Sequence, residues 1–374
     1  MKIAVAGILS KRIQANSLGG TEQFTYLLVE KLVKDNYDVS LYSTSDSVTS
    51  SNLLSVCNLK DIEGIFEAGI DTRLPYNLLQ SVRIAEESNR YDLIHNNYFD
   101  SFLLTAFSDW ISCPIISTVH NDFWHFPHLR EVLLKFHRAN RDKLVFVSNK
   151  AQELAGRPPD SVVIHNGIDE SLYRFSEVNK SDSLFWVSRI VPKKGSKEAI
   201  EISKITGNAL TLIGRPSLIP EHKKYFDQYI TPNLSEKIKL VDNNSTDEKI
   251  EYFQSAKAFL FPIQWEEPFG FVVAESMACG TPVITYARGA MPEIVQDGVT
   301  GFLVNSSDED IRGDFIVKKT GIEGMVEAVN RMYALHPEEY KQMRHASRKR
   351  VEEHFTVEKM VSSYEKLYKE ILQR

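Results

Sequence analysis

Short apolar runs alternate with amphipathic stretches along the chain, and they form two successive series. The first series lies at residues 3–6, 39–42, 93–94, 115–119, 144–147 and 162–164. The second lies at residues 184–187, 210–213, 238–241, 259–261, 283–285 and 302–304. This alternation is typical of parallel sheets covered by helices. The sequence therefore predicts an α/β protein with two doubly wound, Rossmann-like parallel-sheet domains.

A polar stretch separates the two series. Residues 173–183 show little periodicity and contain several turn-forming residues, so we place the interdomain linker there. The predicted domains span residues 1–174 and 183–353. A final helix within 356–374 must cover an apolar surface, because six apolar residues recur at helix spacing. They are Met360, Val361, Tyr364, Leu367, Tyr368 and Ile371.

Composition limits the classes of function. The chain has 374 residues and a net charge of -6, which argues against general nucleic-acid binding. Its three cysteines, Cys57, Cys113 and Cys279, are widely spaced, which argues against a disulfide framework and a structural zinc site and favours the cytoplasm. No segment is long and apolar enough for a membrane span, and the first apolar run reads as a strand rather than a signal peptide.

The segment from Glu267 to Glu275 is the strongest functional signal. Pro268 disfavours helix at Glu267, so this carboxylate is predicted in a loop at the entrance of a helix. Gly270 leaves the N–H groups of Phe271 and Val272 accessible, and a helix N-terminus attracts anionic or oxygen-rich groups. Taken alone, the two glutamates also fit an ordinary helix start.

Three other polar positions follow predicted strands. Gly19-Gly20 offers bare amides at a helix start, although its spacing is not that of dinucleotide binders. Arg189 and Lys194 follow the first strand of the second series and could clamp a diphosphate. His120 ends a strand, where functional side chains collect. A flexible glycine loop, a solvated basic loop and a packing histidine are the respective structural alternatives.

A metal site is not predicted. The histidines at 95, 125, 128 and 137 lack metal-ligand spacing with acidic partners. The run Asp308-Glu309-Asp310 lies beyond the last strand and reads as a helix cap.

Together these residues resemble retaining glycosyltransferases of family 4, which have a GT-B fold of two Rossmann-like domains facing a cleft. The resemblance covers nearly the whole chain. It rests on the following residues: Gly19-Gly20, His120, Asn166-Gly167-Ile168-Asp169, Arg189, Lys194-Gly195, Glu267 and Glu275.

The resemblance implies a role for each position. Glu267 would accept hydrogen bonds from donor-sugar hydroxyls, and Glu275 would hold the ribose of the nucleotide. Arg189 and Lys194 would neutralise the leaving diphosphate, and His120 would lie beside the transferred sugar. Backbone amides would complete the site, those of Gly270, Phe271 and Val272 at the sugar and those of Gly19 and Gly20 at the diphosphate. The family needs no metal or other cofactor, and its last helix crosses back to the N-terminal domain.

Three departures from the family pattern affect nucleotide and sugar contacts. Ser188 stands where a glycine is usual, Ala290 replaces the second glycine of a pair, and Arg215-Pro216 replaces an Asp-Gly turn. The resulting expectation is a transferase that moves a sugar from a nucleotide diphosphate, with UDP favoured and GDP as an alternative, to an unknown acceptor hydroxyl. A nucleotide-sugar 2-epimerase or a phosphorylase of the same fold and a non-catalytic nucleotide-sugar-binding protein are the rival interpretations.

Residues 125–143 suggest one further partner. Arg130, Lys135, Arg138, Arg141 and Lys143 are interspersed with apolar side chains, a pattern suited to the surface of an anionic membrane. An ordinary helix with its apolar face on the sheet has the same pattern. The expected setting is the cytoplasm, with peripheral contact at the inner membrane face as the variant, in synthesis of bacterial surface glycans or a glycosylated metabolite.

Overall fold

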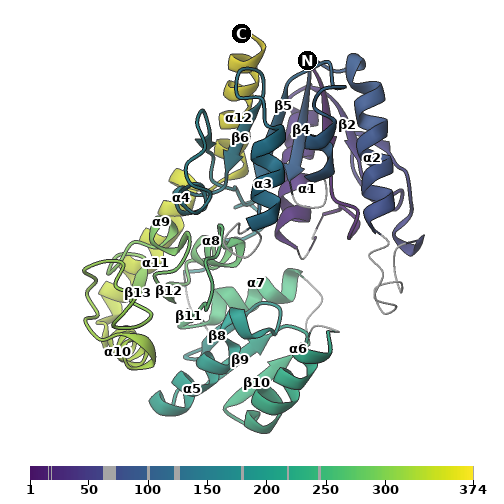
Figure 1. Ribbon diagram of the computed structural model, residues 1–374. Coiled ribbons are helices and arrows are strands. Elements are labelled where there is room, and N and C mark those ends of the chain that lie inside the picture. Colours follow the sequence, from purple (N-terminus) through teal and green to yellow (C-terminus); the bar gives the residue numbers. More distant parts are fainter. Residues whose placement is uncertain are drawn as a thin grey trace. The chain divides into compact units, whose positions relative to one another are not determined.

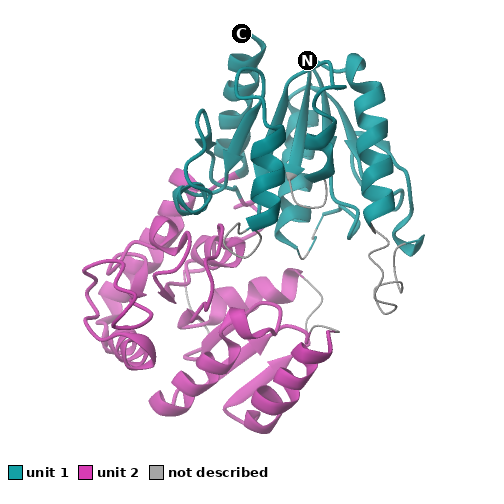
Figure 2. Cartoon of the chain, viewed as in Figure 1, with its two compact units in different colours: residues 1–167, 357–374 teal, residues 168–356 magenta. Residues whose placement is uncertain are grey.

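The computed structural model describes residues 1–15, 17, 19–61, 73–98, 102–121, 127–177, 181–216, 219–242 and 246–373. It divides into unit 1, which comprises Met1–Gly167 and Val357–Arg374, and unit 2, which comprises Ile168–Thr356 (Figures 1 and 2). The border between them precedes the predicted linker. Tyr173, where that linker was placed to begin, is instead buried in unit 2, and its ring centre lies 6.4 Å from that of Phe253.

Unit 1 is built on a parallel sheet with the strand order β3-β2-β1-β4-β5-β6-β7. The strands are β1 (Lys2–Ala6), β2 (Asp38–Tyr42), β3 (Asn52–Leu54), β4 (Leu93–Tyr98), β5 (Ile115–Val119), β6 (Lys143–Phe146) and β7 (Val162–Val163). The helices are α1 (Gly20–Lys34), α2 (Arg73–Glu87), α3 (Pro127–Phe136), α4 (Asn149–Leu154) and α12 (Val357–Leu372). β5 is buried along its whole length, as expected for a central strand covered on both faces.

Unit 2 repeats this architecture with the strand order β10-β9-β8-β11-β12-β13. Its strands are β8 (Leu184–Val187), β9 (Leu210–Ile213), β10 (Ile238–Val241), β11 (Ala258–Phe261), β12 (Val283–Tyr286) and β13 (Gly301–Val304). Its helices are α5 (Ser196–Thr206), α6 (Pro220–Tyr225), α7 (Thr246–Ser255), α8 (Phe271–Ala278), α9 (Met291–Ile294), α10 (Gly321–Ala334) and α11 (Pro337–His354). The predicted fold class, two Rossmann-like parallel-sheet domains, is confirmed.

The last helix, α12, packs on unit 1 although unit 2 precedes it in sequence. The six apolar residues singled out by their spacing are its buried residues. Two tyrosines on this face also make buried polar contacts. The Tyr368 hydroxyl lies 2.5 Å from His95 Nδ1, and the Tyr364 hydroxyl lies 2.8 Å from Thr118 Oγ1. Because His95 Nε2 is also 2.8 Å from Thr118 Oγ1, one hydrogen-bonded network joins α12 to β4 and β5.

The buried His95 should make the stability of unit 1 depend on pH. Desolvation lowers the pKa of His95 to about 3, whereas an unfolded chain leaves it near 6.5. Between these values the unfolded state binds more protons, so stability is present above about pH 6.5 and is lost as the pH falls toward 3. From pH 7 to pH 5 we expect this histidine alone to cost about 2 kcal/mol of unfolding free energy.

Urea titration read out by hydrogen exchange in β4 and β5 measures this loss for unit 1. His95→Gln keeps a polar side chain but does not titrate, so it should reduce the dependence by this amount and leave the share that comes from His120. An equally steep dependence in the variant would assign the titration to other groups.

Only part of the basic surface predicted at 125–143 is available, because three of its cations, which follow α3, already have partners. Arg141 Nη1 donates to the carbonyl of Ile111 at 2.6 Å, and Lys143 Nζ donates to the carbonyl of Asp160 at 2.9 Å. Arg138 forms an ion pair with Asp109 at 2.8 Å. Arg130 and Lys135 are exposed, whereas Leu133 is packed in the core of unit 1. Membrane contact through 125–143 stays a prediction, but fewer of its cations are available to lipid headgroups than the sequence suggested. Residues 125 and 126 lie outside the described residues.

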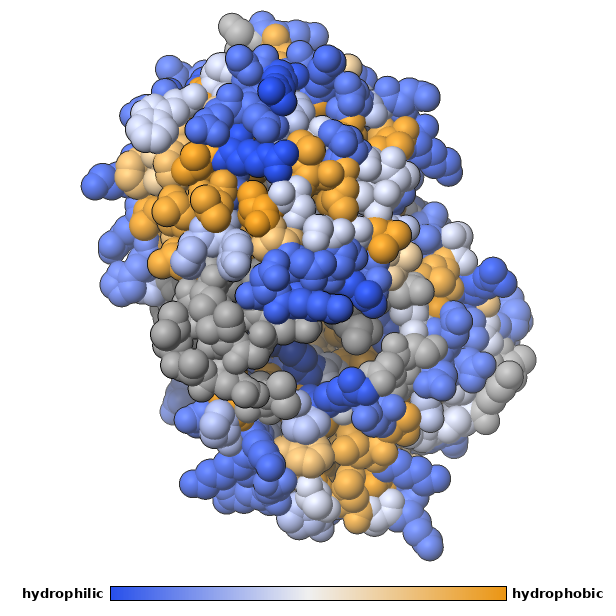
Figure 3. Space-filling view, turned by 90° about the vertical axis from the view of Figure 1, so that its right-hand side faces the viewer, coloured by the Kyte–Doolittle hydropathy of each residue, from blue (hydrophilic) through white to orange (hydrophobic). Residues whose placement is uncertain are grey.

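Helix α2 carries several exposed apolar side chains. Leu74, Leu78 and Leu79 are exposed by 49%, 44% and 53%. Figure 3 looks onto the side of the molecule where α2 lies in Figure 1, and apolar side chains gather there among polar ones. Within the described residues, no helix combines the length and apolar character needed to cross a membrane.

Candidate active site

The topology of unit 2 brings two predicted site residues to one edge of its sheet. The strand order reverses between β8 and β11, which are hydrogen-bonded neighbours. Ligands of doubly wound sheets bind at the carboxyl ends of the strands at such a reversal. Lys194 follows β8 and Glu267 follows β11. The two residues are separated by 73 positions in sequence, and the fold alone juxtaposes them.

Lys194 and Glu267 form a direct ion pair. The Lys194 ammonium donates to Glu267 Oε2, and Trp265 Nε1 donates to the same oxygen at 2.8 Å. The two charged side chains are only 11% and 13% exposed, so their attraction is stronger than it would be in water. Both hydrogen bonds go to Oε2, which leaves Oε1, as far as the described residues show, to a ligand. Lys193 Nζ lies 3.8 Å from the centre of the Trp265 ring and adds a second positive charge.

The backbone around this pair is tightly packed. Gly195 has φ +76° and lies so close to the Pro262 carbonyl that a Cβ would collide with it. Gly289 has φ +56° and packs against the backbone of Glu267 in the same way. Ala290, one of the departures from the family pattern, donates its N–H to the Glu267 carbonyl at 2.8 Å. Both charged residues are therefore held on backbones with little freedom to move.

Gly270 has the conformation that glycine favours at this turn. Its φ is +96°, and a Cβ there would lie 2.7 Å from Met291 Cε. The helix α8 begins at the next residue. The N–H groups of Phe271 and Val272 donate to none of the described residues, so the helix entrance offers them to an acceptor.

Glu275 lies on α8 but is deeply buried. It is 1% exposed, and its Oε2 accepts a hydrogen bond from Lys249 Nζ of α7 at 2.9 Å. Lys249 also donates to the Tyr173 hydroxyl at 3.1 Å. No motif marked Lys249 in the sequence, because its partner is distant along the chain. A ribose that reaches Glu275 would meet a carboxylate whose position is set by Lys249.

Arg189 is on the same loop as Lys194 but does not join the ion pair. Its side chain is exposed. Its backbone carbonyl accepts from the Val191 N–H at 3.0 Å. Among the described residues, its guanidinium has no hydrogen-bond or ion-pair partner. The structure thus brings Lys194 and Glu267 together and leaves Arg189 directed to solvent.

Unit 1 places His120 in a polar and aromatic environment. His120 Nε2 lies 3.3 Å from Asn97 Oδ1, and its ring centre lies 4.5 Å from that of Phe24. Asn97 Nδ2 in turn donates to Thr25 Oγ1 at 2.8 Å, which orients the amide. Desolvation lowers the pKa of His120 far below its usual value, so the ring is neutral at pH 7. With Nε2 donating to Asn97, Nδ1 is the acceptor of the neutral ring. Sequence reasoning missed Asn97 and Phe24.

Gly19 and Gly20 begin α1, but a carboxylate lies next to them. Gly19 is the N-cap and Gly20 the first helical residue. Glu22 is 6% exposed and packs so closely on Gly19 that a Cβ there would collide with its carboxylate. Lys11 Nζ lies 3.4 Å from Glu22 Oε1 and offsets part of the charge. A diphosphate at these amides would therefore meet an acidic neighbour, which the glycine pair alone did not predict.

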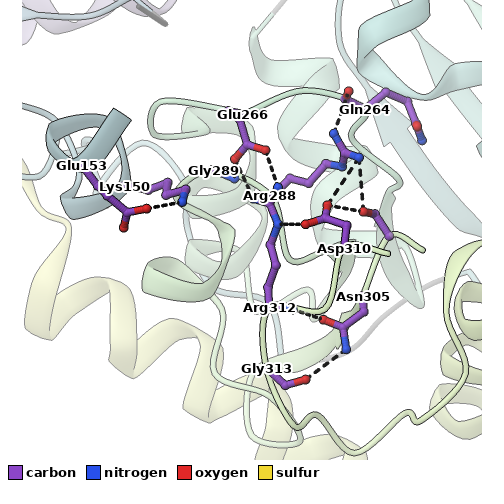
Figure 4. Close-up of polar contacts among 11 residues, drawn as sticks. Lys150, Glu153, Gln264, Glu266, Arg288, Gly289, Asn305, Asp310, Arg312 and Gly313 are labelled. Carbon is purple, nitrogen blue, oxygen red and sulfur yellow. Dashed lines mark hydrogen bonds and ion pairs between the residues drawn. The ribbon is translucent and has the colours of Figure 1, made fainter. Parts of the chain in front are cut away.

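A cluster of ion pairs supports the loop that carries Glu267 (Figure 4). Arg312 donates to both oxygens of Glu266, at 2.7 and 2.6 Å, and its Nε donates to Asp310 at 2.6 Å. Arg288 lies 3.5 Å from Asp310. Desolvation by burial would raise the pKa of Glu266, but the hydrogen bonds from Arg312 and Gly289 and the charges of Arg312 and Arg288 together lower it.

The prediction for Asp308-Glu309-Asp310 needs a correction at Asp310. This side chain pairs with arginines instead of capping a helix. Asp308 accepts from Thr320 Oγ1 at 2.7 Å, and Thr320 is the N-cap residue of α10. The described residues contain no group of three His, Cys, Asp or Glu side chains that could hold a metal ion. Cys57, Cys113 and Cys279 are free and buried.

Comparison with known proteins identifies the class of enzyme. Residues 170–350 match the family model described as glycosyl transferases group 1, and residues 18–172 match the model described as glycosyltransferase family 4. The chain is a glycosyltransferase of the GT-B type.

Individual relatives are distant. An uncharacterized glycosyltransferase of Methanocaldococcus jannaschii is 26% identical, over 97% of this chain and 98% of its own length. Sucrose-phosphate synthase from Thermosynechococcus elongatus has a similar structure, with a TM-score of 0.79, 18% identity and coverage of 100% of this chain and 99% of its own. HepE from Anabaena, solved in complex with UDP-glucose, has a TM-score of 0.74, 19% identity and coverage of 99% and 100%. These two likenesses support the fold.

Proposed function

We propose that this glycosyltransferase moves a sugar from a nucleotide diphosphate to an acceptor hydroxyl with retention of the anomeric configuration, and that UDP is the favoured nucleotide. The observation that carries the proposal is the Lys194–Glu267 pair at the strand reversal of unit 2, next to the Phe271 and Val272 N–H groups, which have no acceptor among the described residues. The UDP-glucose bound to HepE supports the choice of donor class. The biological setting we propose is cytoplasmic synthesis of a surface glycan or a glycosylated metabolite.

The proposed chemistry separates charge across the breaking bond. Cleavage of the glycosidic bond to the phosphate places positive charge on the sugar and negative charge on the diphosphate. Lys194 would stabilise the leaving diphosphate, and the exposed guanidinium of Arg189 is available for a second phosphate contact. The Glu267 carboxylate would accept hydrogen bonds from sugar hydroxyls through Oε1. Exclusion of water would protect the donor from hydrolysis.

His120 is proposed to contact the transferred sugar as a neutral group. Its Nδ1 can accept a hydrogen bond from a hydroxyl, while Asn97 holds Nε2. His120→Phe keeps an aromatic ring against Phe24 and removes that acceptor. We expect it to lower kcat/KM by about 2- to 10-fold, since loss of one hydrogen bond costs roughly 0.5–1.5 kcal/mol. Steady-state kinetics check this value, and wild-type activity in the variant would remove His120 from the site.

The decisive experiment is a donor screen of the wild-type protein. Thermal shift with UDP, GDP and ADP sugars identifies the nucleotide, because a ligand at a hundred times its Kd stabilises the folded state by about 2.7 kcal/mol. NMR of the product made with the bound donor then gives the anomeric configuration. Inverted product would refute retention. We expect full activity in EDTA, since the proposed charge stabilisation comes from Lys194 and Arg189.

Incubation with donor alone separates the rival functions. A 2-epimerase would convert the nucleotide sugar without an acceptor, and a phosphorylase would require inorganic phosphate. A non-catalytic binding protein would shift the melting temperature and release no nucleotide. Slow release of free nucleotide from the donor would favour the transferase over this last alternative.

A further inference from the structure

Glu266 and Glu267 are consecutive, yet each has its own cationic partner. Glu267 pairs with Lys194 from the loop after β8, whereas Glu266 pairs with Arg312 from the segment after β13. The Glu266 and Arg312 side chains are only 11% and 24% exposed. Because Arg312 binds both carboxylate oxygens, its planar guanidinium fixes the direction of Glu266 as well as its charge.

Glu266 also joins Arg312 to the backbone that holds Glu267. Its Oε2 accepts the Gly289 N–H at 2.8 Å. The next residue, Ala290, donates its N–H to the Glu267 carbonyl at 2.8 Å, and Gly289 itself packs on the Glu267 backbone. One continuous set of contacts therefore runs from Arg312 through Glu266 and the 289–290 turn to Glu267.

The backbone of Arg312 is also held in place by local contacts. Its backbone N–H donates to Asn305 Oδ1 at 2.8 Å, and Asn305 Nδ2 donates to the Gly313 carbonyl at 3.0 Å (Figure 4). Asn305 directly follows β13. The side chain of Arg312 thus extends from a segment anchored at the end of a core strand, which makes it a rigid support for the Glu266–Glu267 loop.

We propose that Arg312 is a positioning residue for Glu267. It binds Glu266, which keeps the 289–290 turn in place and leaves Lys194 as the cation for Glu267. Without Arg312, a nearly buried Glu266 carboxylate would keep only the Gly289 N–H among the contacts described above. It would then turn toward Arg288, the other positive charge that acts on it, and the loop would move with it. The inference rests on the proposed function only in giving Glu267 a role in transfer.

The test compares Arg312→Ala and Arg312→Lys with Arg331→Ala. Arg331 is the matched control, because it pairs with Glu327 on the exposed surface of α10. We expect Arg312→Ala to lower kcat by about 10-fold with the donor KM changed by less than about 3-fold, since misplacement of a catalytic group acts mainly on turnover. Arg312→Lys, which keeps the charge without the planar fork, should fall between. Guanidinium at millimolar concentration should partly restore Arg312→Ala, and urea should not.

Hydrogen exchange supplies a measurement that needs no substrate. In Arg312→Ala the amides of Gly289 and Ala290 should exchange faster, whereas in Arg331→Ala they should not. Exchange at the wild-type rate, or a kcat within about 2-fold of the control, would overturn the proposal. If the wild-type protein transfers no sugar, the proposed function fails and the exchange rates alone decide the role of Arg312. If Arg312→Ala is unstable, Glu266→Gln, which keeps an acceptor for Gly289, replaces it under the same two criteria.

Discussion

Replacement of Lys194 by alanine is expected to lower kcat by about 10²–10³-fold, as does loss of one preorganised group that stabilises transition-state charge. Lys194 is fixed by its pairing with Glu267 and by packing at Gly195, so it needs little reorganisation when negative charge develops on the leaving diphosphate. A ground-state donor carries less charge at that point. The donor KM should therefore change far less than kcat.

The measurement is steady-state kinetics with the donor found in the thermal-shift screen. Lys197→Ala is the control, because Lys197 is exposed at the start of α5 and its Nζ lies 4.8 Å from the centre of the Tyr229 ring. Circular dichroism and melting temperature must show that Lys194→Ala folds, since it leaves Glu267 without its lysine. An unchanged kcat in a folded Lys194→Ala would exclude Lys194 from catalysis.

The fold was predictable because its main signal is local. Central strands such as β5 and β11 are buried along their whole length. A buried strand has a short continuous run of apolar residues bounded by turns, and this run can be recognised in the sequence. β3 escaped prediction because it has only three residues, Asn52–Leu54, all of them partly or fully exposed. The face of α12 was predicted for a similar reason, since helix periodicity marks a buried stripe whatever it packs against.

The linker was harder to place because burial at Tyr173 depends on distant residues. Arg348 of α11 donates to the Tyr173 carbonyl at 2.8 Å, and Lys249 donates to its hydroxyl. These partners make Tyr173, the start of that polar stretch, a buried part of unit 2. Contacts with residues so distant in the sequence cannot be predicted from local composition.

The site residues also differ in whether their contacts could be predicted from local sequence. Lys194 and Glu267 could be expected near each other, because the carboxyl ends of parallel strands meet at one sheet edge. The partners that orient Lys194 and Glu267 could not be predicted from the sequence. Arg312 lies 46 positions from Glu266, and neither belongs to a motif. Arg189 belongs to a motif and lies on the same loop as Lys194, yet its side chain is exposed to solvent and does not join the Lys194–Glu267 pair. A motif can therefore mark the correct loop without predicting the contact.

Loss of the buried cation at Lys249 should strongly destabilise unit 2 at the position where we propose that Glu275 binds the nucleotide. In Lys249→Met the Glu275 carboxylate, 1% exposed, loses its ion-pair partner. Breaking a buried pair by removing one partner costs about 3–5 kcal/mol, whereas replacing both partners with apolar groups is often nearly neutral. Lys249→Met should therefore lower the unfolding free energy of unit 2 by that amount. Lys249→Met combined with Glu275→Leu should recover most of it.

The double variant separates the structural role of Glu275 from its proposed contact with the ribose. If the carboxylate binds the nucleotide, the restored fold should still bind donor at least about 10-fold more weakly, because a hydrogen bond to a charged group contributes roughly 1.5–3 kcal/mol. Urea unfolding followed by hydrogen exchange in α7 and α8 measures the stability, and calorimetric titration measures the donor Kd. Wild-type affinity in a stable double variant would show that Glu275 serves the packing of α7 on α8 and that the nucleotide is held by other groups.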